Sequence, residues 1–370
     1  MGSYLPCAAT SLHLLLLLAS SEAAAAAAAA SASLSAGGHR RYHSIFNFGD
    51  SFADTGNKPV AYAWYPLPSN VMRPPYGETF FGHPTGRSSD GRLILDLIGN
   101  VAAAAHRRRP AGLGLPFVPP YLAHGGSFGG GANFAVAGAT ALDAGFFHDR
   151  DIPGAGSKFP LNTSLDVQLA WFESLTPSLC GTAQDNQTRR LMKHGAKSIV
   201  VPGMIPSGCS PPALTSFYGR AGPADYDART GCLRGINELA SHHNSLLQDA
   251  LHELRNCPNI HVREVGMRVG HSRGAELWDD PVSATAARYP IGFREDVLTV
   301  CCGGGGPYNF NESVACGGAA ATACEDPSAS LYFDGAHLTE AGYRHVADGW
   351  LSSINSCLCA QPHTMKLRRA

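Results

Sequence analysis

Residues 45–57 of the chain read Ile-Phe-Asn-Phe-Gly-Asp-Ser-Phe-Ala-Asp-Thr-Gly-Asn. The apolar start predicts a strand, and Gly49 allows a sharp turn at its end. Ser51 would then emerge at the carboxyl edge of a sheet, where open α/β folds place their ligands. Its backbone N–H would lie at a helix start, ready to donate to an oxyanion. For Gly-Asp-Ser alone, a serine that caps a helix is the simpler interpretation.

The rest of the chain alternates β-rich runs with helical patterns, which predicts an α/β layer fold. The β-rich runs lie at 44–48, 133–136, 198–201 and 260–265. Apolar residues recur every third or fourth position from Leu233 to Leu254 and predict an amphipathic helix. A last helix is expected after Thr339, a suitable N-cap. Neither an internal repeat nor a linker marks a second core, so we expect one domain over residues 37–370.

Composition excludes several classes of partner. The 370 residues hold 28 Lys and Arg against 29 Asp and Glu, a net charge of −1, which leaves no electrostatic footprint for nucleic acid. Gly303 to Gly306 lacks the Lys-Ser/Thr of a phosphate-binding loop, and the His242-His243 pair fits a helix better than a metal site. We therefore expect no nucleic acid, no cofactor and no metal.

Residues 1–36 have the character of a signal peptide. Leu14 to Ala19 is a short apolar segment, an alanine run follows it, and small residues suit cleavage between Ala23 and His39. The Leu-rich part is far shorter than the ~20 residues of a membrane-spanning helix. We expect a secreted, extracellular protein that is monomeric and has no stable membrane anchor.

Cysteines and glycosylation sequons agree with export. Of the 11 cysteines, Cys7 lies in the leader, and an even set in a secreted chain predicts disulfides. The mature cysteines are Cys180, Cys209, Cys232, Cys257, Cys301, Cys302, Cys316, Cys324, Cys357 and Cys359. Sequons predict glycosylation at Asn162, Asn186 and Asn311.

A serine nucleophile needs a base, and the base needs an orienting carboxylate. Asp334 stands three residues before His337, in a loop that precedes the last helix. This spacing lets the carboxylate reach one imidazole nitrogen while the other nitrogen faces the serine. A surface histidine beside a helix cap is the commoner meaning of Asp-x-x-His alone. Together with Gly-Asp-Ser, the pair predicts a triad of Ser51, His337 and Asp334.

Six stretches of the chain resemble the plant GDSL esterase/lipase family, a branch of the SGNH hydrolases. They are FNFGDSFADTGN, RPPYGETFFGHPTGRSSDGRLILDLI, GANFAVAGATALD, IVVPGMIPSGCSP, CCGGGGPYNF and SLYFDGAHLTEAGYRHVADGW, and the likeness runs from about His43 to Cys359. The resemblance implies a three-layer α/β/α flavodoxin-like fold with Ser51 as nucleophile, His337 as base and Asp334 as its partner. It also implies that Gly138 shares the oxyanion hole with Ser51, although a simple turn glycine is the alternative.

The resemblance further implies a carboxylic ester hydrolase that needs no cofactor and acts in the apoplast or cell wall. The substrate would be a small acyl ester, or an acylated glycan or lipid. Acetylated polysaccharide, phenolic ester and short lipid ester all stay open, because the loops that would contact substrate are generic Gly- and Pro-rich sequence.

The chain departs from the family in two places. The family's Gly-x-Asn-Asp block, whose Asn donates to the oxyanion, belongs between Cys180 and Ser198, but residues 181–194 are too few to hold it. Gly235-Ile236-Asn237-Glu238 is a near match inside the amphipathic helix. We expect one strand and its adjacent helices to be missing with the block, and activity to be reduced. Residues 264–290 also fit the family poorly.

Two rival functions remain. The first is a secreted protein of the same fold that binds acylated glycans or lipids without turnover, because the Asn block is absent. The second is an α/β-hydrolase that uses Ser272, since Gly270 to Gly274 fits Gly-x-Ser-x-Gly and His124-Gly125-Gly126 imitates an oxyanion loop. The residues after Ser272 form a poor helix, and Ser127, in a second match at 125–129, has no strand before it.

Overall fold

The computed structural model describes residues 42–63, 65, 69–99, 112–123, 127–150, 161–179, 198–255, 261–265, 293–294 and 296–356. The expected signal peptide, the sequon at Asn186 and the alternative nucleophile Ser272 lie outside the described residues. So do Cys180, Cys257, Cys357 and Cys359. Among the described residues no helix is long and apolar enough to span a membrane.

The first parallel pair of strands carries the Gly-Asp-Ser turn. Strand β1 (Ile45–Asn47) pairs with β2 (Gly131–Asn133), with Ile45 opposite Gly131. A side chain at Gly131 would place its Cβ 1.8 Å from the Ile45 carbonyl oxygen, so only glycine allows the strands to approach this closely. The strand expected at 133–136 overlaps β2 only at Asn133, since the ladder begins at Gly131 and residues 134–136 lie beyond its end. Its continuation holds the turn, because Phe134 N–H donates to the Asn47 carbonyl at 2.8 Å.

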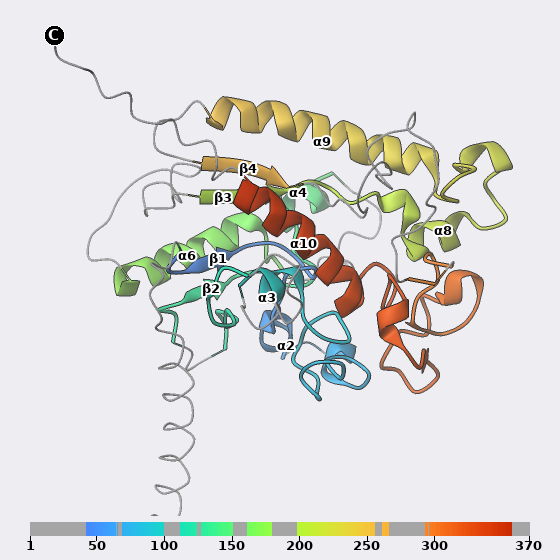
Figure 1. Ribbon diagram of the computed structural model, residues 1–370, viewed down its shortest axis with the longest axis horizontal. Helices are drawn as coiled ribbons and strands as arrows, with labels where there is room; N and C mark the ends of the chain where they lie inside the picture. The colour runs from blue at the N-terminus through green and yellow to red at the C-terminus, as the bar shows by residue number, and fades with distance from the viewer. Residues whose placement is uncertain are drawn as a thin grey trace, which may run out of the picture. The chain divides into compact units, whose positions relative to one another are not determined.

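A second parallel pair follows later in the chain. Strand β3 (Ser198–Pro202) pairs with β4 (His261–Val265), and the long helix α9 (Arg234–Arg255) connects them and lies beside β4 (Figure 1). Within the described residues no strand joins β1–β2 to β3–β4. The α/β class is confirmed.

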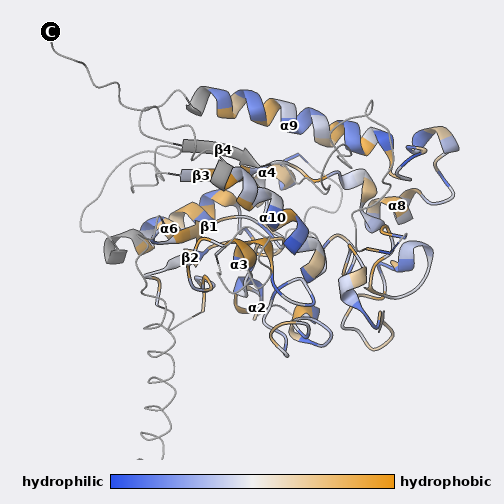
Figure 2. Cartoon of the chain, viewed as in Figure 1, coloured by the Kyte–Doolittle hydropathy of each residue, from blue (hydrophilic) through white to orange (hydrophobic). Residues whose placement is uncertain are grey.

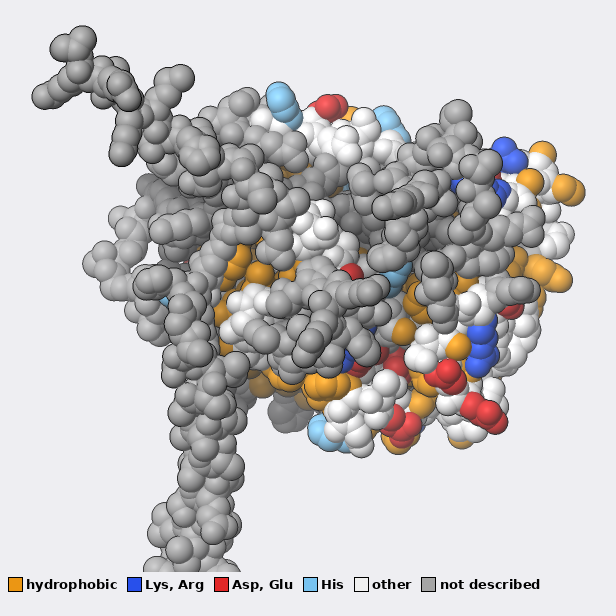
Figure 3. Space-filling view, in the orientation of Figure 1, with side chains coloured by type: hydrophobic (Ala, Val, Ile, Leu, Met, Phe, Trp, Pro, Cys, Tyr) orange, Lys and Arg blue, Asp and Glu red, His pale blue; other side chains and the backbone are white. Residues whose placement is uncertain are grey.

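Helices cover these strands and supply most of the core. The longer ones are α6 (Leu165–Leu179) and α10 (Glu340–Ser356), and the shorter ones are α2 (Asn57–Ala61), α3 (Ile94–Gly99), α4 (Ala144–His148) and α8 (Pro211–Phe217). Apolar residues gather on α3 and α6, whereas α9 carries many hydrophilic ones (Figure 2). The face shown in Figure 3 carries side chains of both charge signs.

Two apolar clusters hold the strands against the helices. Leu97 on α3 packs with Val346 and Leu351 on α10, and Val200 of β3 packs against the same cluster. Phe46 and Phe48 flank the end of β1 and pack with Phe172 of α6, at ring centroid distances of 5.2 and 5.7 Å. The end of β1 is thus fixed by burial as well as by its ladder.

Helix α10 begins where the sequence indicates. The Thr339 hydroxyl accepts a hydrogen bond from Gly342 N–H at 3.0 Å, which is the N-cap interaction expected of this residue. The Glu340 carboxylate accepts from Arg92 at 2.7 Å, a nearly buried ion pair. The last helix is therefore tied to a loop that lies 248 positions earlier in the chain.

Among the described residues three disulfides fasten the loops, and the prediction of disulfides is confirmed. They join Cys209 to Cys232, Cys301 to Cys324 and Cys302 to Cys316. The neighbours Cys301 and Cys302 thus have different partners. Cys302–Gly303 is also strand β5, which pairs antiparallel with β6 (Thr322–Ala323). Both disulfides of this region lie beside the loop that carries Asp334.

Candidate active site

The turn that carries Ser51 is fixed by a buried glutamine. Gly49 has φ +145°, a conformation that favours glycine, and its N–H donates to Gln168 Oε1 at 2.9 Å. The Gly49 carbonyl accepts from Gln168 Nε2, also at 2.9 Å. The side chain on α6 therefore pairs with the Gly49 peptide as a neighbouring strand would. The next three residues close a tight turn, because the Asp50 carbonyl accepts from Ala53 N–H at 3.1 Å.

Asp54 joins this turn to the segment that leads into Gly138. Its completely buried carboxylate accepts four backbone N–H groups, from Gly56, Asn57 and Lys58 in its own loop and from Ala137 across the site at 2.8 Å. Burial raises the pKa of Asp54, and the four N–H donors act against that rise. Because one carboxylate binds both segments, it sets the distance between the Ser51 turn and the residue before Gly138.

Gly138 itself is exposed and adopts φ +91°. A Cβ at this position would lie 3.5 Å from the Tyr62 hydroxyl oxygen, an ordinary contact. The requirement for glycine therefore comes from the backbone conformation and not from a lack of space.

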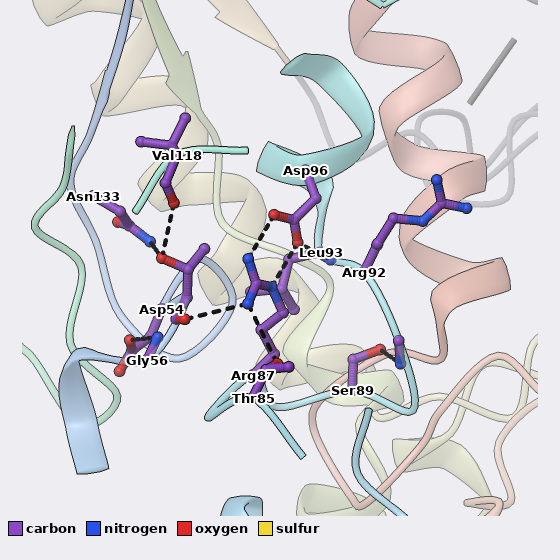
Figure 4. A network of polar contacts seen from close by, with 12 residues as sticks. Asp54, Gly56, Thr85, Arg87, Ser89, Arg92, Leu93, Asp96, Val118 and Asn133 are labelled. Atoms are coloured by element: carbon purple, nitrogen blue, oxygen red, sulfur yellow. Dashed lines mark hydrogen bonds and ion pairs between the residues drawn. The ribbon is translucent and has the colours of Figure 1, made fainter. Parts of the chain in front are cut away.

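A buried polar network connects the loop that follows Ser51 to β2 and α3 (Figure 4). Asn133 on β2 donates to the Ala53 carbonyl at 2.6 Å and to the Thr55 hydroxyl at 2.8 Å. The guanidinium of Arg87 donates to the Thr55 carbonyl and forms two 2.8 Å bonds with Asp96 on α3. The loop that follows Ser51 is thus bonded to β2 and, through Arg87, is linked to α3.

Asp334 and His337 are paired in a loop that the chain closes on itself. His337 Nδ1 lies 2.7 Å from Asp334 Oδ1, and Phe333 N–H donates to the His337 carbonyl at 2.8 Å. Gly335 between them has φ +134°, and a Cβ there would come within 2.8 Å of the Phe310 ring. Backbone N–H groups of the disulfide-bonded neighbours Cys301 and Cys302 donate to this loop, to the carbonyls of residues 332 and 333 at 3.0 and 2.7 Å.

A second partner of the carboxylate escapes the sequence patterns. Tyr76 donates from its hydroxyl to Asp334 Oδ2 at 2.6 Å. Tyr76 belongs to a matching stretch, RPPYGETF, but no local spacing connects it with a residue 258 positions away. Gln168 escapes the sequence patterns for the same reason, because its partner Gly49 is 119 positions away. The one feature that could indicate its role is that it is a buried polar residue on a helix.

The electrostatics of the pair suit a general base. Burial alone would raise the pKa of Asp334, but the charge and hydrogen bond of His337 and the Tyr76 hydrogen bond outweigh it, so this pKa is lowered. For His337, burial acts to lower the pKa, while Asp334 and, more weakly, Asp50 raise it above the ordinary value. The ionised Asp334 favours the tautomer with the proton on Nδ1, which leaves Nε2 as an acceptor.

The Ser51 turn and the loop of Asp334 and His337 approach each other through Asp50 and Phe52, the sequence neighbours of Ser51. The Phe52 ring lies 5.4 Å from the His337 ring, centroid to centroid, and Asp50 acts on His337 through its charge. Phe52 also meets the ring of Tyr343 on α10 edge-on. The structure thus brings the Ser51 turn, the segment before Gly138 and the Asp334–His337 pair into one region.

The chain matches the GDSL-like Lipase/Acylhydrolase family over residues 45–170 and 172–350. It belongs to that family. The match includes all four residues predicted for catalysis and the oxyanion hole, and the expectation of an ester hydrolase is confirmed at the level of the family.

Curated relatives agree. The chain is 37% identical to the GDSL esterase/lipase At5g45910 of Arabidopsis thaliana, with 84% of this chain and 91% of the relative covered. It is 35% identical to a sinapine esterase of Brassica napus, with 85% and 86% covered. The alignment with the Arabidopsis relative has 363 positions, but it includes only 84% of the 370 residues of this chain. The relative therefore has residues at positions where this chain has a gap.

Proposed function

We propose that the protein is a secreted serine esterase with Ser51 as nucleophile, His337 as general base and Asp334 as the carboxylate that orients it. The Ser51 oxygen attacks the ester carbonyl while its proton passes to His337 Nε2. The tetrahedral intermediate collapses as His337 returns that proton to the departing alcohol. Water then attacks the acyl-serine with the same base, which releases the acid and restores Ser51.

One observation carries this proposal: the paired Asp334 and His337 lie next to the turn from Asp50 to Ala53, which contains Ser51. The support lies in the 2.7 Å bond between Asp334 and His337 and in the approach of Phe52 and Asp50 to the imidazole. The backbone N–H groups of Ser51 and Gly138 would stabilise the oxyanion. Asp54 supports that arrangement, because it binds the segments on which both donors lie.

The substrate class is a carboxylic ester of a small alcohol, a glycan or a lipid. The names of the relatives, esterase/lipase and sinapine esterase, support an ester substrate.

The direct experiment is labelling of the purified protein with a fluorophosphonate, followed by sequencing of the tagged peptide. We expect the tag on Ser51 and its loss in Ser51→Ala, while Ser272→Ala keeps it. A tag on Ser272 would replace both the site and the mechanism.

A specific observation favours a second function, a binding protein of the same fold without turnover. The described parallel strands fall into two separate pairs, and the alignment leaves a gap in this chain. If the gap removes the Asn donor, transition-state stabilisation falls while binding of an acylated glycan or lipid survives. A folded protein that takes no tag but retains such a ligand would support this function and contradict the first.

Secretion is supported by the leader and by the disulfides. Asn162 and Asn311 are exposed, so both sequons are accessible in the folded chain. We expect a mature N-terminus between Ala23 and Arg41 and a mass decrease on deglycosylation. An intact leader on a cytosolic, reduced protein would contradict export.

A further inference from the structure

We propose that Tyr76 is a positioning residue for catalysis, which holds the Asp334 carboxylate in the orientation that His337 requires. This role rests on the proposed function, because it acts through the base and not on the substrate. Tyr76 belongs to none of the roles assigned above, and it is 4% exposed.

The geometry leaves the carboxylate no freedom to rotate. Asp334 Oδ1 is bound to His337 at 2.7 Å and Oδ2 to the Tyr76 hydroxyl at 2.6 Å. A carboxylate with only one partner can turn about its last bond and weaken the bond to the imidazole. With a donor on each oxygen, the Oδ1 lone pair stays directed at Nδ1.

The Tyr76 ring is itself held by packing. It meets the Phe333 ring edge-on at 5.2 Å and lies in a buried cluster with Val71 and the disulfide-bonded Cys301, Cys302 and Cys316. Its backbone N–H donates to the Arg73 carbonyl at 3.1 Å. The hydroxyl therefore has one direction available, and that direction is Asp334.

Tyr76 also stays neutral, which suits a donor. Burial and the charge of Asp334 raise the pKa of the phenol far above its usual range. The hydroxyl thus donates without removing the carboxylate charge, so Asp334 can still stabilise the imidazolium. A cationic donor at this place would cancel part of that charge.

Among the described residues, the charged groups with the largest effect on His337 are Asp334, Asp50 and Lys58. Tyr343, on α10, is a further buried hydroxyl that the charge of Asp334 affects. Of Tyr76 and Tyr343, it is Tyr76 that makes the hydrogen bond to the carboxylate.

The test is Tyr76→Phe, which keeps the ring and its packing and removes only the hydroxyl. We expect kcat for an activated ester to fall about tenfold or more, with KM little changed, because a hydrogen bond to a charged group is lost. The acid limb of kcat/KM should move to higher pH, since a carboxylate without its second donor is a stronger acceptor for the imidazolium. Tyr121→Phe is the matched control, because it removes a hydroxyl bonded to Ser174 at 2.8 Å outside the site, and it should change neither value.

A double-variant cycle separates positioning from a purely structural role, even if Tyr76→Phe is less stable. In the Asp334→Asn background, removal of the hydroxyl should add little further loss of kcat. Additive losses, or an unshifted pH profile, would overturn the positioning role while fluorophosphonate labelling of Ser51 still upheld the esterase. Absence of that label from the unmodified protein would overturn both.

Discussion

We expect the titration of the His337 imidazole to set how esterase activity depends on pH. Asp334 and Asp50 raise the pKa of this imidazole, and burial and Lys58 oppose them. Under the proposed mechanism catalysis needs the neutral imidazole, which is lost as the pH falls through the raised pKa. The enzyme should therefore lose activity on acidification earlier than a histidine with an ordinary pKa would allow.

We expect kcat/KM to rise with pH through an inflection above the ordinary histidine pKa of 6.5. In Asp334→Asn the inflection should move down, because the main charge that raises this pKa is gone. The rate should fall by up to ~10⁴, since an amide that donates to Nδ1 leaves the proton on Nε2. Initial rates over a pH series measure both effects, and an unmoved inflection would show that another group sets it.

Buried polar side chains join the elements around the site, in addition to the apolar clusters. Arg87, in the loop before α3, binds Asp96 on the helix and the carbonyl of Thr55 beside the nucleophile turn. The Arg87 and Asp96 side chains are only 8% and 0% exposed. Removal of one member leaves an uncompensated buried charge, which is more damaging than loss of the whole pair.

Arg87→Ala should therefore lower the free energy of unfolding by about 3–5 kcal/mol. Urea titration followed by circular dichroism measures it. The matched control is Arg150→Ala, because Arg150 is exposed and stacks on Phe146 at the end of α4. That control should change stability by no more than about 0.5 kcal/mol. Equal effects of the two substitutions would mean that Arg87 is not a structural centre of the site.

The Gly-x-Asn-Asp block that the sequence lacks can be tested by inserting it. Insertion of the family's Gly-x-Asn-Asp block with its strand between Gln187 and Thr188, outside the described residues, should raise kcat by ~10²–10³, since that is what one oxyanion donor typically contributes. KM should change less, and the inserted block with Asn replaced by Ala is the control. Full family-like activity in the unmodified chain would show that another group already supplies the donor.

Local patterns predicted the parallel strands and the long helices α9 and α10, but they predicted neither the other helices nor most of the connections between elements. The strand before Gly49, helix α9 and the Thr339 cap all follow from periodicity and residue type within a short window. Gln168 and Tyr76 could not be predicted this way, because each acts on a partner more than a hundred positions distant. Side-chain direction in the folded state, and not sequence spacing, determines those contacts.

At the scale of the whole molecule, two disulfides are connected by hydrogen bonds to the loop that carries Asp334. Cys301 and Cys302 donate from their backbones to the loop of Asp334, and each is fixed by its own disulfide. The loop that carries the base is therefore supported by covalent bonds as well as by hydrogen bonds.

We expect the Cys302→Ser, Cys316→Ser double variant to lose about 2–5 kcal/mol of stability. It should also lose kcat, because the strand beside Asp334 is released. The control removes the Cys209–Cys232 disulfide, which joins the segment before α8 to the start of α9. It should lower Tm with a smaller effect on kcat. Thermal unfolding and ester turnover measure the two effects. Equal losses of kcat in the two variants would show that the Cys302–Cys316 disulfide has no specific role at the site.

The site is drawn from both ends of the chain, and this has a consequence for the timing of synthesis. Tyr76 and Asp334 are 258 positions apart, and Ser51 precedes Tyr76. At roughly 5–20 residues per second, Ser51 leaves the ribosome tens of seconds before His337, its proposed base, is synthesised. Under the proposed mechanism, nascent chains and products of premature termination are catalytically silent. Ester cleavage then requires synthesis at least as far as His337, so the producing cell is not exposed to active enzyme that lacks this part of the chain.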